Sequence, residues 1–163
     1  MSDEDKPLAG SGRLLIAAGV GFALCVLVGV GYAVSIMPEI RAQRRIKNEA
    51  AAVQSLIRIK TAQTLYRESA AKRYGSLEEL EESRHLDAGH AGGPRLGYVF
   101  EAAPGPDPGS SWWAKASPQF PGKTGGRYFY LDQGGMVYES EADFPVPPPA
   151  AALPSEKLRP LGQ

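Results

Sequence analysis

The chain has little of what most catalytic and metal-binding sites need. Among its 163 residues are one cysteine, Cys25, and two histidines, His85 and His90. A single cysteine excludes an internal disulfide, and so few histidine and cysteine ligands supply a zinc site poorly. The formal net charge is zero, so no long-range field draws the protein to nucleic acid. No nucleophile elbow, phosphate-binding glycine loop or HExxH motif is present. We expect no enzyme activity, cofactor, metal or nucleic-acid partner.

Charged side chains are also missing from one long stretch. Residues 14–37, from Leu14 to Met37, form a run of 24 residues without Asp, Glu, Lys or Arg. As a helix this run is about 36 Å long, enough to cross a bilayer core of about 30 Å. The run predicts a transmembrane helix after a short polar tail over residues 1–13. The alternatives are a cleaved signal peptide, whose apolar region is typically about 7–15 residues, and a lipid anchor at Cys25.

Small side chains recur every four residues within this run. A helix places such residues in one narrow strip, which lets two helix backbones approach closely in lipid. The strip predicts packing against a second copy or a partner helix, beside the membrane lipid itself. The alternative is the ordinary glycine-rich composition of membrane helices. The residues of the strip are Ala17, Gly21, Cys25, Gly29 and Ala33.

A second helical segment follows the apolar run. Pro38 predicts a kink, because proline lacks the amide that the helix ladder needs. The residues from Ile40 to Arg73 include no Gly or Pro and predict one long amphipathic helix, stopped at Gly75. Its expected buried stripe comprises Ile46, Ala50, Val53, Leu56, Ile57 and Leu65.

Beyond the long helix the pattern changes to short elements. Ser76 and Glu79 have capping-box spacing and predict a short helix with Leu77, Leu80 and Leu86 on its inner face. After a glycine-rich loop, apolar residues alternate with a period of two, which is typical of strands. Gln133-Gly134-Gly135 predicts a hairpin turn. The expected strands are Gly97–Ala102, Trp112–Ser117, Arg127–Asp132 and Met136–Ser140.

These elements predict an α+β fold over residues 38–142. A small antiparallel sheet of three or four strands has one wet face and needs a cover on the other. The stripe of the long helix is the expected cover. Residues 143–163 are rich in proline and predict a disordered, extended tail. The prolines of this tail are Pro145, Pro147, Pro148, Pro149, Pro154 and Pro160.

The order of these elements resembles type IV pilins and the pseudopilins of type II secretion. Local segments carry the likeness too: Met37-Pro38-Glu39-Ile40-Arg41-Ala42-Gln43, Asn48-Glu49-Ala50-Ala51-Ala52-Val53-Gln54-Ser55-Leu56, Ile59-Lys60-Thr61-Ala62-Gln63-Thr64-Leu65-Tyr66, Gly122-Lys123-Thr124-Gly125 and Arg127-Tyr128-Phe129-Tyr130-Leu131-Asp132-Gln133-Gly134-Gly135. The resemblance covers residues 14–140. It implies a single-pass protein of the bacterial inner membrane whose C-terminal domain lies in the periplasm or outside. It also implies that other pilin-like subunits or secretion-machine proteins are the partners.

The chain departs from the prepilin pattern at its N-terminus. Prepilins carry a leader that ends in Gly before Phe or Met, and a Glu near the start of the apolar run. Here Gly10 and Gly12 precede Ser11 and Arg13, and no acidic residue lies between Arg13 and Pro38. The chain is therefore expected to be an uncleaved anchor or a divergent accessory subunit. The positive-inside rule alone would place the C-terminal side in the cytoplasm, because more basic residues follow the run than precede it; the resemblance places it outside.

Three groups of polar and aromatic residues offer alternatives to purely structural roles. His85, Asp87 and His90 lie close together in sequence and could form part of a metal site or be solvated loop residues. Asp132 could bind calcium, as loops do in some pseudopilins, or cap its turn. Ser110 and Ser111 have no nearby base in the sequence. Trp112 and Trp113 could form a sugar- or protein-binding platform, or one could pack in the core while the other lies on the surface. Neighbours in a strand point to opposite faces, so at most one of them is exposed.

Two functions follow from these expectations. The first is a membrane-anchored pilin-like or pseudopilin-like structural or accessory subunit of a type IV pilus or type II secretion assembly, acting by protein–protein packing. The second is a bitopic membrane-anchored binding module with an extracytoplasmic pilin-like domain. Neither function requires a pocket or a catalytic residue.

Overall fold

A long helix, a short helix and an antiparallel sheet make up the described part of the chain. This computed structural model describes residues 11–148 and 158–162, with backbone only for residues 11–28, 30, 31, 33, 34, 70 and 71. The chain divides into two compact units, Met1–Ala42 and Gln43–Gln163. In chain order the elements are α1 (Ser11–Tyr66), η1 (Arg67–Ala71), α2 (Leu77–Glu82), β1 (Tyr98–Pro104), β2 (Trp112–Pro118), β3 (Tyr128–Asp132), β4 (Val137–Ser140) and β5 (Arg159–Pro160).

In the first unit the described residues are helical. Helix α1 is continuous through Pro38. The kink predicted at Pro38 stays a prediction. Most of the predicted membrane span, residues 14–37, falls on residues whose side chains lie outside the description. In the portion that the structure describes, no helical segment is both long and apolar enough to cross a membrane.

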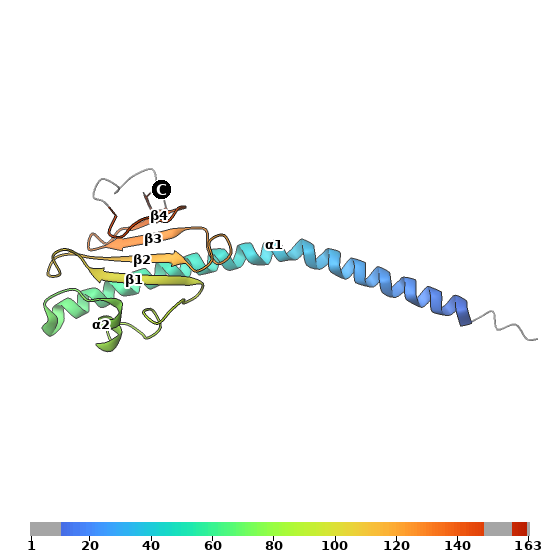
Figure 1. Cartoon of the computed structure of the whole chain (residues 1–163), viewed down its shortest axis with the longest axis horizontal. Coiled ribbons are helices and arrows are strands. Elements are labelled where there is room, and N and C mark those ends of the chain that lie inside the picture. The colour runs from blue at the N-terminus through green and yellow to red at the C-terminus, as the bar shows by residue number, and fades with distance from the viewer. Residues whose placement is uncertain (1–10, 149–157, 163) are drawn as a thin grey trace, which may run out of the picture. The chain divides into compact units, whose positions relative to one another are not determined.

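The second unit contains a five-stranded antiparallel sheet in the order β1-β2-β3-β4-β5 (Figure 1). Each strand pairs with its neighbours in sequence, so the strands form a simple meander. The four predicted strands are confirmed to within two residues at each end. The turn between β3 and β4 contains Gly135 at φ +78°, a conformation that glycine adopts without strain. The sheet and its covering helix confirm the α+β fold class.

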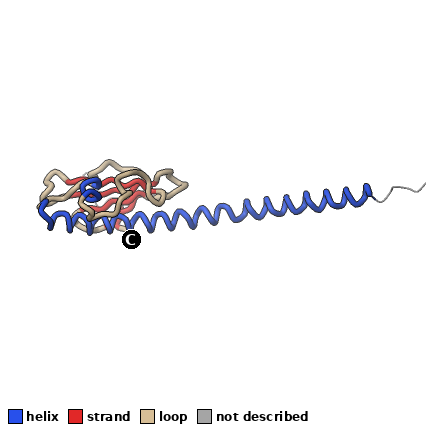
Figure 2. The backbone as a smooth tube through the Cα atoms, turned by 90° about the horizontal axis from the view of Figure 1, so that it is seen from below, coloured by secondary structure: helices blue, strands red, loops and turns tan. Residues whose placement is uncertain are grey.

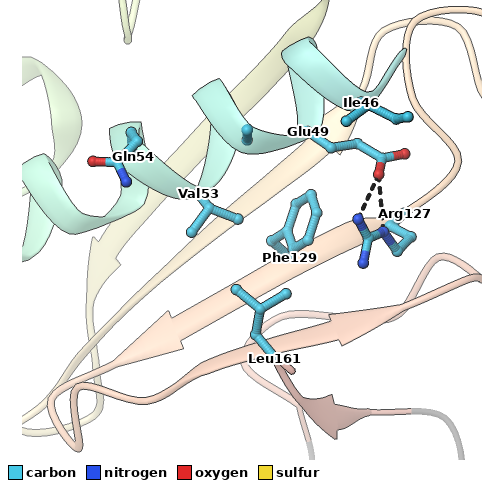
Figure 3. A pocket seen from close by; sticks show the side chains of 8 residues that line it. Ile46, Glu49, Val53, Gln54, Arg127, Phe129 and Leu161 are labelled. Atoms are coloured by element: carbon cyan, nitrogen blue, oxygen red, sulfur yellow. Dashed lines mark hydrogen bonds and ion pairs between the residues drawn. The ribbon is translucent and has the colours of Figure 1, made fainter. Parts of the chain in front are cut away.

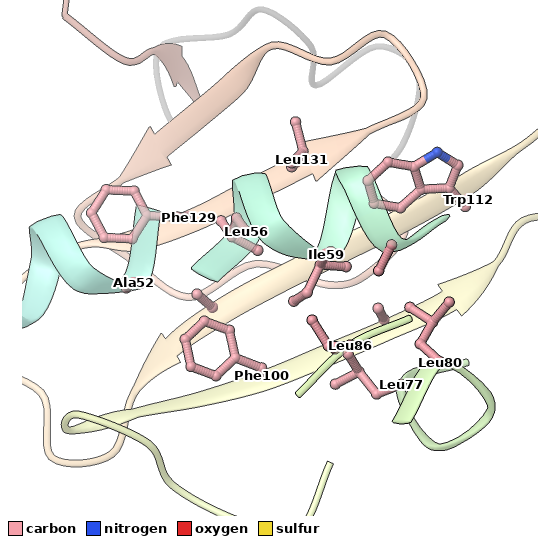
Figure 4. Packing of buried hydrophobic residues seen from close by; sticks show 14 of the residues in the cluster. Ala52, Leu56, Ile59, Leu77, Leu80, Leu86, Phe100, Trp112, Phe129 and Leu131 are labelled. Atoms are coloured by element: carbon pink, nitrogen blue, oxygen red, sulfur yellow. The ribbon is translucent and has the colours of Figure 1, made fainter. Parts of the chain in front are cut away.

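The hydrophobic core of this unit lies between α1 and one face of the sheet (Figures 2 and 4). Along β2, Trp112, Ala114 and Ala116 alternate toward this core, as the period of two requires. The short helix α2 closes one side of the core through its two leucines. The fully or nearly buried apolar side chains from the helices are Ala52, Leu56, Ile59, Ala62, Leu77 and Leu80.

The predicted buried stripe of α1 is mostly wrong. Of its six residues only Leu56 is fully buried, and Val53 is half-buried. Ile46, Ile57 and Leu65 are 62%, 43% and 47% exposed. The helix instead turns a mixed face to the sheet, on which the small Ala52 and Ala62 lie beside the large Leu56 and Ile59. The sheet presents alanines at the contact, so small residues on both sides allow the helix to lie close.

The long helix also ends earlier than predicted. The helical turns of η1 are followed by Lys72 in the left-handed conformation, with φ of 53°. Gly75 is not the stop signal. It is buried, and its backbone N–H and C=O both bond the side-chain amide of Gln63, at 2.9 and 2.7 Å. The predicted capping box of Ser76 and Glu79 is confirmed at the start of α2.

The prediction of a disordered tail over residues 143–163 is wrong for the described parts of that tail. Asp143 and Phe144 bond the side chain of Lys115, which is part of β2. Farther on, Leu158 is 2% exposed and Arg159–Pro160 pair with β4 as an edge strand. Proline is tolerated there because an edge strand needs hydrogen bonds on one side only.

Candidate functional site

The polar residues singled out from the sequence do not converge on one point. The ring Nδ1 of His85 lies 2.9 Å from the Ser83 hydroxyl, and Nδ1 of His90 lies 3.0 Å from the backbone oxygen of Asp87. Within residues 11–148 and 158–162 no three His, Cys, Asp or Glu side chains are placed to hold one metal ion. The alternative reading as solvated loop residues is wrong for His90, which is buried.

His90 is 1% exposed, and its Nε2 has no hydrogen-bond partner among the described residues. Its ring packs edge-on against Phe100, with centroids 5.6 Å apart. Its backbone N–H, together with that of Ala91, donates to the carboxylate of Glu81. Burial by itself raises the pKa of Glu81, but these donors outweigh burial and hold that pKa below its usual value. The arrangement ties the glycine-rich loop to α2.

Asp132 and the tryptophan pair have structural surroundings. The carboxylate of Asp132 accepts a bond from the Gly134 N–H at 2.8 Å, so it caps the turn, as one of the two sequence readings has it. Trp112 is 3% exposed and faces the core. Trp113 is half-buried on the opposite face of the sheet. The expectation that at most one tryptophan is exposed is confirmed.

A shallow groove lies beside α1 on the β3 side of the sheet (Figure 3). Its volume is about 310 Å³, at the small end of the range for ligand pockets. The lining is mainly apolar and includes a residue that follows β5. The lining side chains include Ile46, Ala50, Val53, Arg127, Phe129 and Leu161.

The charged group at one end of this groove is an arginine held between two carboxylates. Arg127 donates to Glu49 of α1 through Nε at 2.9 Å and Nη2 at 2.7 Å, and to Glu139 of β4 through Nη1 at 2.5 Å. Glu49 also accepts the Gly126 N–H at 2.8 Å. Each carboxylate side chain is 11% exposed, whereas that of Arg127 is 41% exposed.

The electrostatics of this triad favour structure over chemistry. Partial burial disfavours the charged guanidinium, but hydrogen bonds and the two negative charges outweigh burial and raise the pKa of Arg127 above its usual value. Each of the three guanidinium nitrogens donates to one of the two carboxylates, so the arginine charge is balanced within the triad. The triad joins α1, β4 and the residue before β3 through charge-assisted bonds.

Sequence reasoning missed this triad. Glu49 and Arg127 are 78 residues apart, and although both lie in segments that resemble pilins, nothing in those segments pairs them. The one local signal was that Glu49 lies on the face of α1 that turns toward the sheet. The sequence prediction assigned that face incorrectly. Long-range pairing of this kind depends on the register of the helix against the sheet.

The predicted membrane-helix strip lies almost wholly outside the described side chains. Gly29 is the exception, and a Cβ built on it would meet no atom within 4 Å. The packing role of the strip therefore stays a prediction. The other residues of the strip are Ala17, Gly21, Cys25 and Ala33.

Comparisons with known proteins add no relative. No family model, no curated protein and no solved structure matches this chain.

Proposed function

We propose that the protein is a membrane-anchored, pilin-like or pseudopilin-like structural or accessory subunit that acts by packing against other proteins of a pilus or secretion assembly. In this proposal residues 14–37 span the bacterial inner membrane once, and the second unit lies in the periplasm or outside. The partners are membrane lipid and other pilin-like or secretion-machine subunits.

The observation that carries the proposal is the exposed apolar strip on α1 within the second unit. Ile46 and Ile57 are 62% and 43% exposed, and Ala50 between them is also exposed. Val53, half-buried, lies on the same side, as spacings of three and four residues require. Leu161 extends the apolar surface across the groove and is 38% exposed. A contiguous apolar strip on one helix face is a surface that a subunit could cover when it packs against other proteins.

The fold and the sequence give the proposal two further supports. A helix packed on an antiparallel meander is the architecture that the pilin resemblance implies for residues 38–142. The uncharged run of residues 14–37 belongs to the same helix α1 that packs on the sheet. An apolar helical stem that continues into the domain suits a protein that functions by assembly.

Purification of the full chain from solubilised membranes tests the proposal. The wild type should co-purify with inner-membrane secretion or pilus components after in-membrane cross-linking. Ile46→Glu should abolish that association because it puts a charge into the apolar strip. Arg58→Glu is the matched control, since Arg58 is exposed on another side of α1 and its contact with Asp87 is long, at 4.0 Å. Loss of association in both variants, or in neither, contradicts the proposed role of the strip.

The absent prepilin signature favours a second candidate, a bitopic binding module anchored by residues 14–37. Gly10 and Gly12 are not followed by Phe or Met, and the apolar run holds no glutamate. This candidate predicts a lone monomer after solubilisation and a mature chain that begins at Met1. A mature chain that begins just after Gly10 or Gly12 supports the pilin-like subunit instead. A reporter fused at Gln163 that proves cytoplasmic eliminates both candidates.

A further inference from the structure

Three segments of the second unit meet at one end of the sheet, beside the first turns of α1 in that unit. Arg45 Nη1 donates to the Gly122 oxygen at 3.4 Å, and Asn48 Nδ2 donates to the Thr124 oxygen at 2.8 Å. The backbone N–H of Gln119 donates to the Gly97 oxygen at 2.9 Å, which joins the two loops. We call residues 43–48, 94–97 and 119–126 together the basic end.

We propose that the basic end docks onto the surface of a bilayer that contains anionic lipid, with Leu96 and Phe120 inserted among the headgroups. The inference rests on the membrane anchor of the proposed function and adds a second, reversible contact with the membrane. It concerns a different surface from the apolar strip on α1.

Two large apolar side chains project from the loops of the basic end. Leu96 is 59% exposed and Phe120 is 54% exposed. The turn that carries Phe120 is held rigidly, because the N–H groups of Lys123 and Thr124 both donate to the Phe120 oxygen at 2.9 Å. The Thr124 hydroxyl in turn accepts the Phe120 N–H at 3.0 Å. Fixed apolar tips lose little conformational entropy on insertion into an interface.

The charge of the three segments has one sign, although the whole chain is neutral. The three segments contain no Asp or Glu. The neighbouring carboxylate, Glu49, is buried and engaged by Arg127 and the Gly126 N–H. Glu141, exposed after β4, lies 4.0 Å from Arg159 and outside the three segments. The cations of the basic end are Arg44, Arg45, Lys47, Arg95 and Lys123.

An anionic bilayer is the partner that this combination fits best. Lysine and arginine near an anionic membrane surface are attracted individually, and apolar side chains among them insert at the headgroup level. Six residues separate the predicted span, which ends at Met37, from Arg44. Even fully extended, that connection reaches only about 25 Å. The bilayer is thus the one surface that the proposed anchor keeps within reach of the basic end at all times.

Environment-sensitive fluorophores on the full chain test this inference. Single cysteines replace Leu96 or Phe120 in a Cys25→Ser background and carry the probe, and the chain is reconstituted into vesicles. Met136→Cys is the matched control: it is 50% exposed, and it lies in the β3–β4 turn at the opposite end of the strands. Vesicles of phosphatidylcholine alone and with phosphatidylglycerol are compared.

The inference predicts a blue shift and quenching by lipid-borne quenchers at positions 96 and 120, and neither at position 136. Lys123→Glu should lower the docked-to-undocked ratio by fivefold or more, since each cation near an anionic surface contributes about a fivefold preference. Lys60→Glu is its control, because Lys60 lies beside Gly135 at the opposite end. High salt should weaken docking, because it screens the headgroup charge.

Separate readouts distinguish failure of the inference from failure of the anchor. Alkaline extraction reports whether the chain stays in the membrane. A chain that resists extraction while probes at 96, 120 and 136 all report water overturns the docking inference and leaves the anchor standing. A chain that is extracted by alkali overturns the anchor, and the docking inference falls with it. Equal shielding at 136 also overturns docking through the basic end.

Discussion

Removal of Arg127 is the sharpest test of how α1 is fixed to the sheet. In Arg127→Met the chain keeps a side chain of similar length, but Glu49 and Glu139 lose their common cation. Both carboxylate side chains are 11% exposed and cannot hydrate freely. The Gly126 N–H still donates to Glu49, so that carboxylate keeps one partner.

The contacts set the expected magnitude. Loss of one partner from a buried ion pair costs about 3–5 kcal/mol. Arg127 itself is 41% exposed, so solvent screening places the expected loss at the lower limit, about 3 kcal/mol. Arg127→Lys retains the charge but loses the two-pronged bond to Glu49, which costs about 1.5 kcal/mol. Glu49→Gln keeps acceptors for Gly126 and leaves Arg127 paired with Glu139, for a loss of about 1–1.5 kcal/mol.

Urea unfolding of the full chain in detergent, followed by tryptophan fluorescence, measures these losses. Trp112 is 3% exposed in the core and reports when the helix leaves the sheet. With a urea slope of about 2 kcal/mol/M, Arg127→Met should unfold about 1.5 M earlier than the wild type. A midpoint within about 0.3 M of the wild type refutes the reasoning, because the triad then contributes no more than a surface ion pair. The urea midpoints of Arg127→Lys and Glu49→Gln should lie between those of the wild type and Arg127→Met.

Three further predictions follow from the described contacts. Leu56→Ala should lower the free energy of unfolding by about 2–4 kcal/mol, whereas Ile57→Ala, at the exposed neighbouring position, should lower it by less than about 1 kcal/mol. Equal losses contradict the observed buried face of α1. The hydrogen bond from Lys115 lowers the pKa of Asp143, so the ionised carboxylate stabilises the fold above the usual pKa of an aspartate, and this stabilisation is lost as pH falls through the lowered value. The melting temperature of Asp143→Asn should lack this loss at acid pH. A variant whose melting temperature depends on pH as that of the wild type does contradicts the contact. Gly125→Ala should unfold well below the wild-type temperature in the same melts, because a Cβ there would collide with the hydroxyl of Tyr98 in β1. A melting temperature equal to that of the wild type contradicts this close approach.

Local sequence signals predicted the short elements well. The capping box of Ser76 and Glu79, the alternation along β2 and the glycine turn after Asp132 each depend on residues within a few positions of one another. Such signals act before any tertiary contact exists, so the sequence alone suffices to find them. The α+β class followed because a sheet with one apolar face needs a cover.

The face of α1 was predicted incorrectly because apolar side chains surround much of the helix. Ile46 and Ile57 have the spacing of a buried stripe, yet they are exposed, while Ala52 is buried. Periodicity ranks faces by hydrophobicity alone. The contact with the sheet also depends on how closely the backbones approach, and small residues allow a close approach. The strongly apolar face is left for another surface, which is the basis of the proposed assembly role.

The C-terminal segment shows a second limit of local reasoning. Its prolines argued against a helix or a central strand, and the described parts, residues 143–148 and 158–162, contain neither. They could not reveal that Leu158 is buried, that Pro160 lies in an edge strand, or that Phe144 packs over Lys115, at 4.8 Å from Nζ to the ring centroid. Each of these contacts joins residues far apart in the sequence, and proline content carries no information about them.

The sequence by itself determined the four main strands, the short helix and their order, because these elements arise from interactions between near neighbours in the chain. Only the tertiary structure decided which face of α1 meets the sheet, that Arg127 joins Glu49 to Glu139, and that loops 94–97 and 119–126 form one basic end. The physical reason is that these contacts depend on helix register and strand order, which bring together side chains that no local pattern connects.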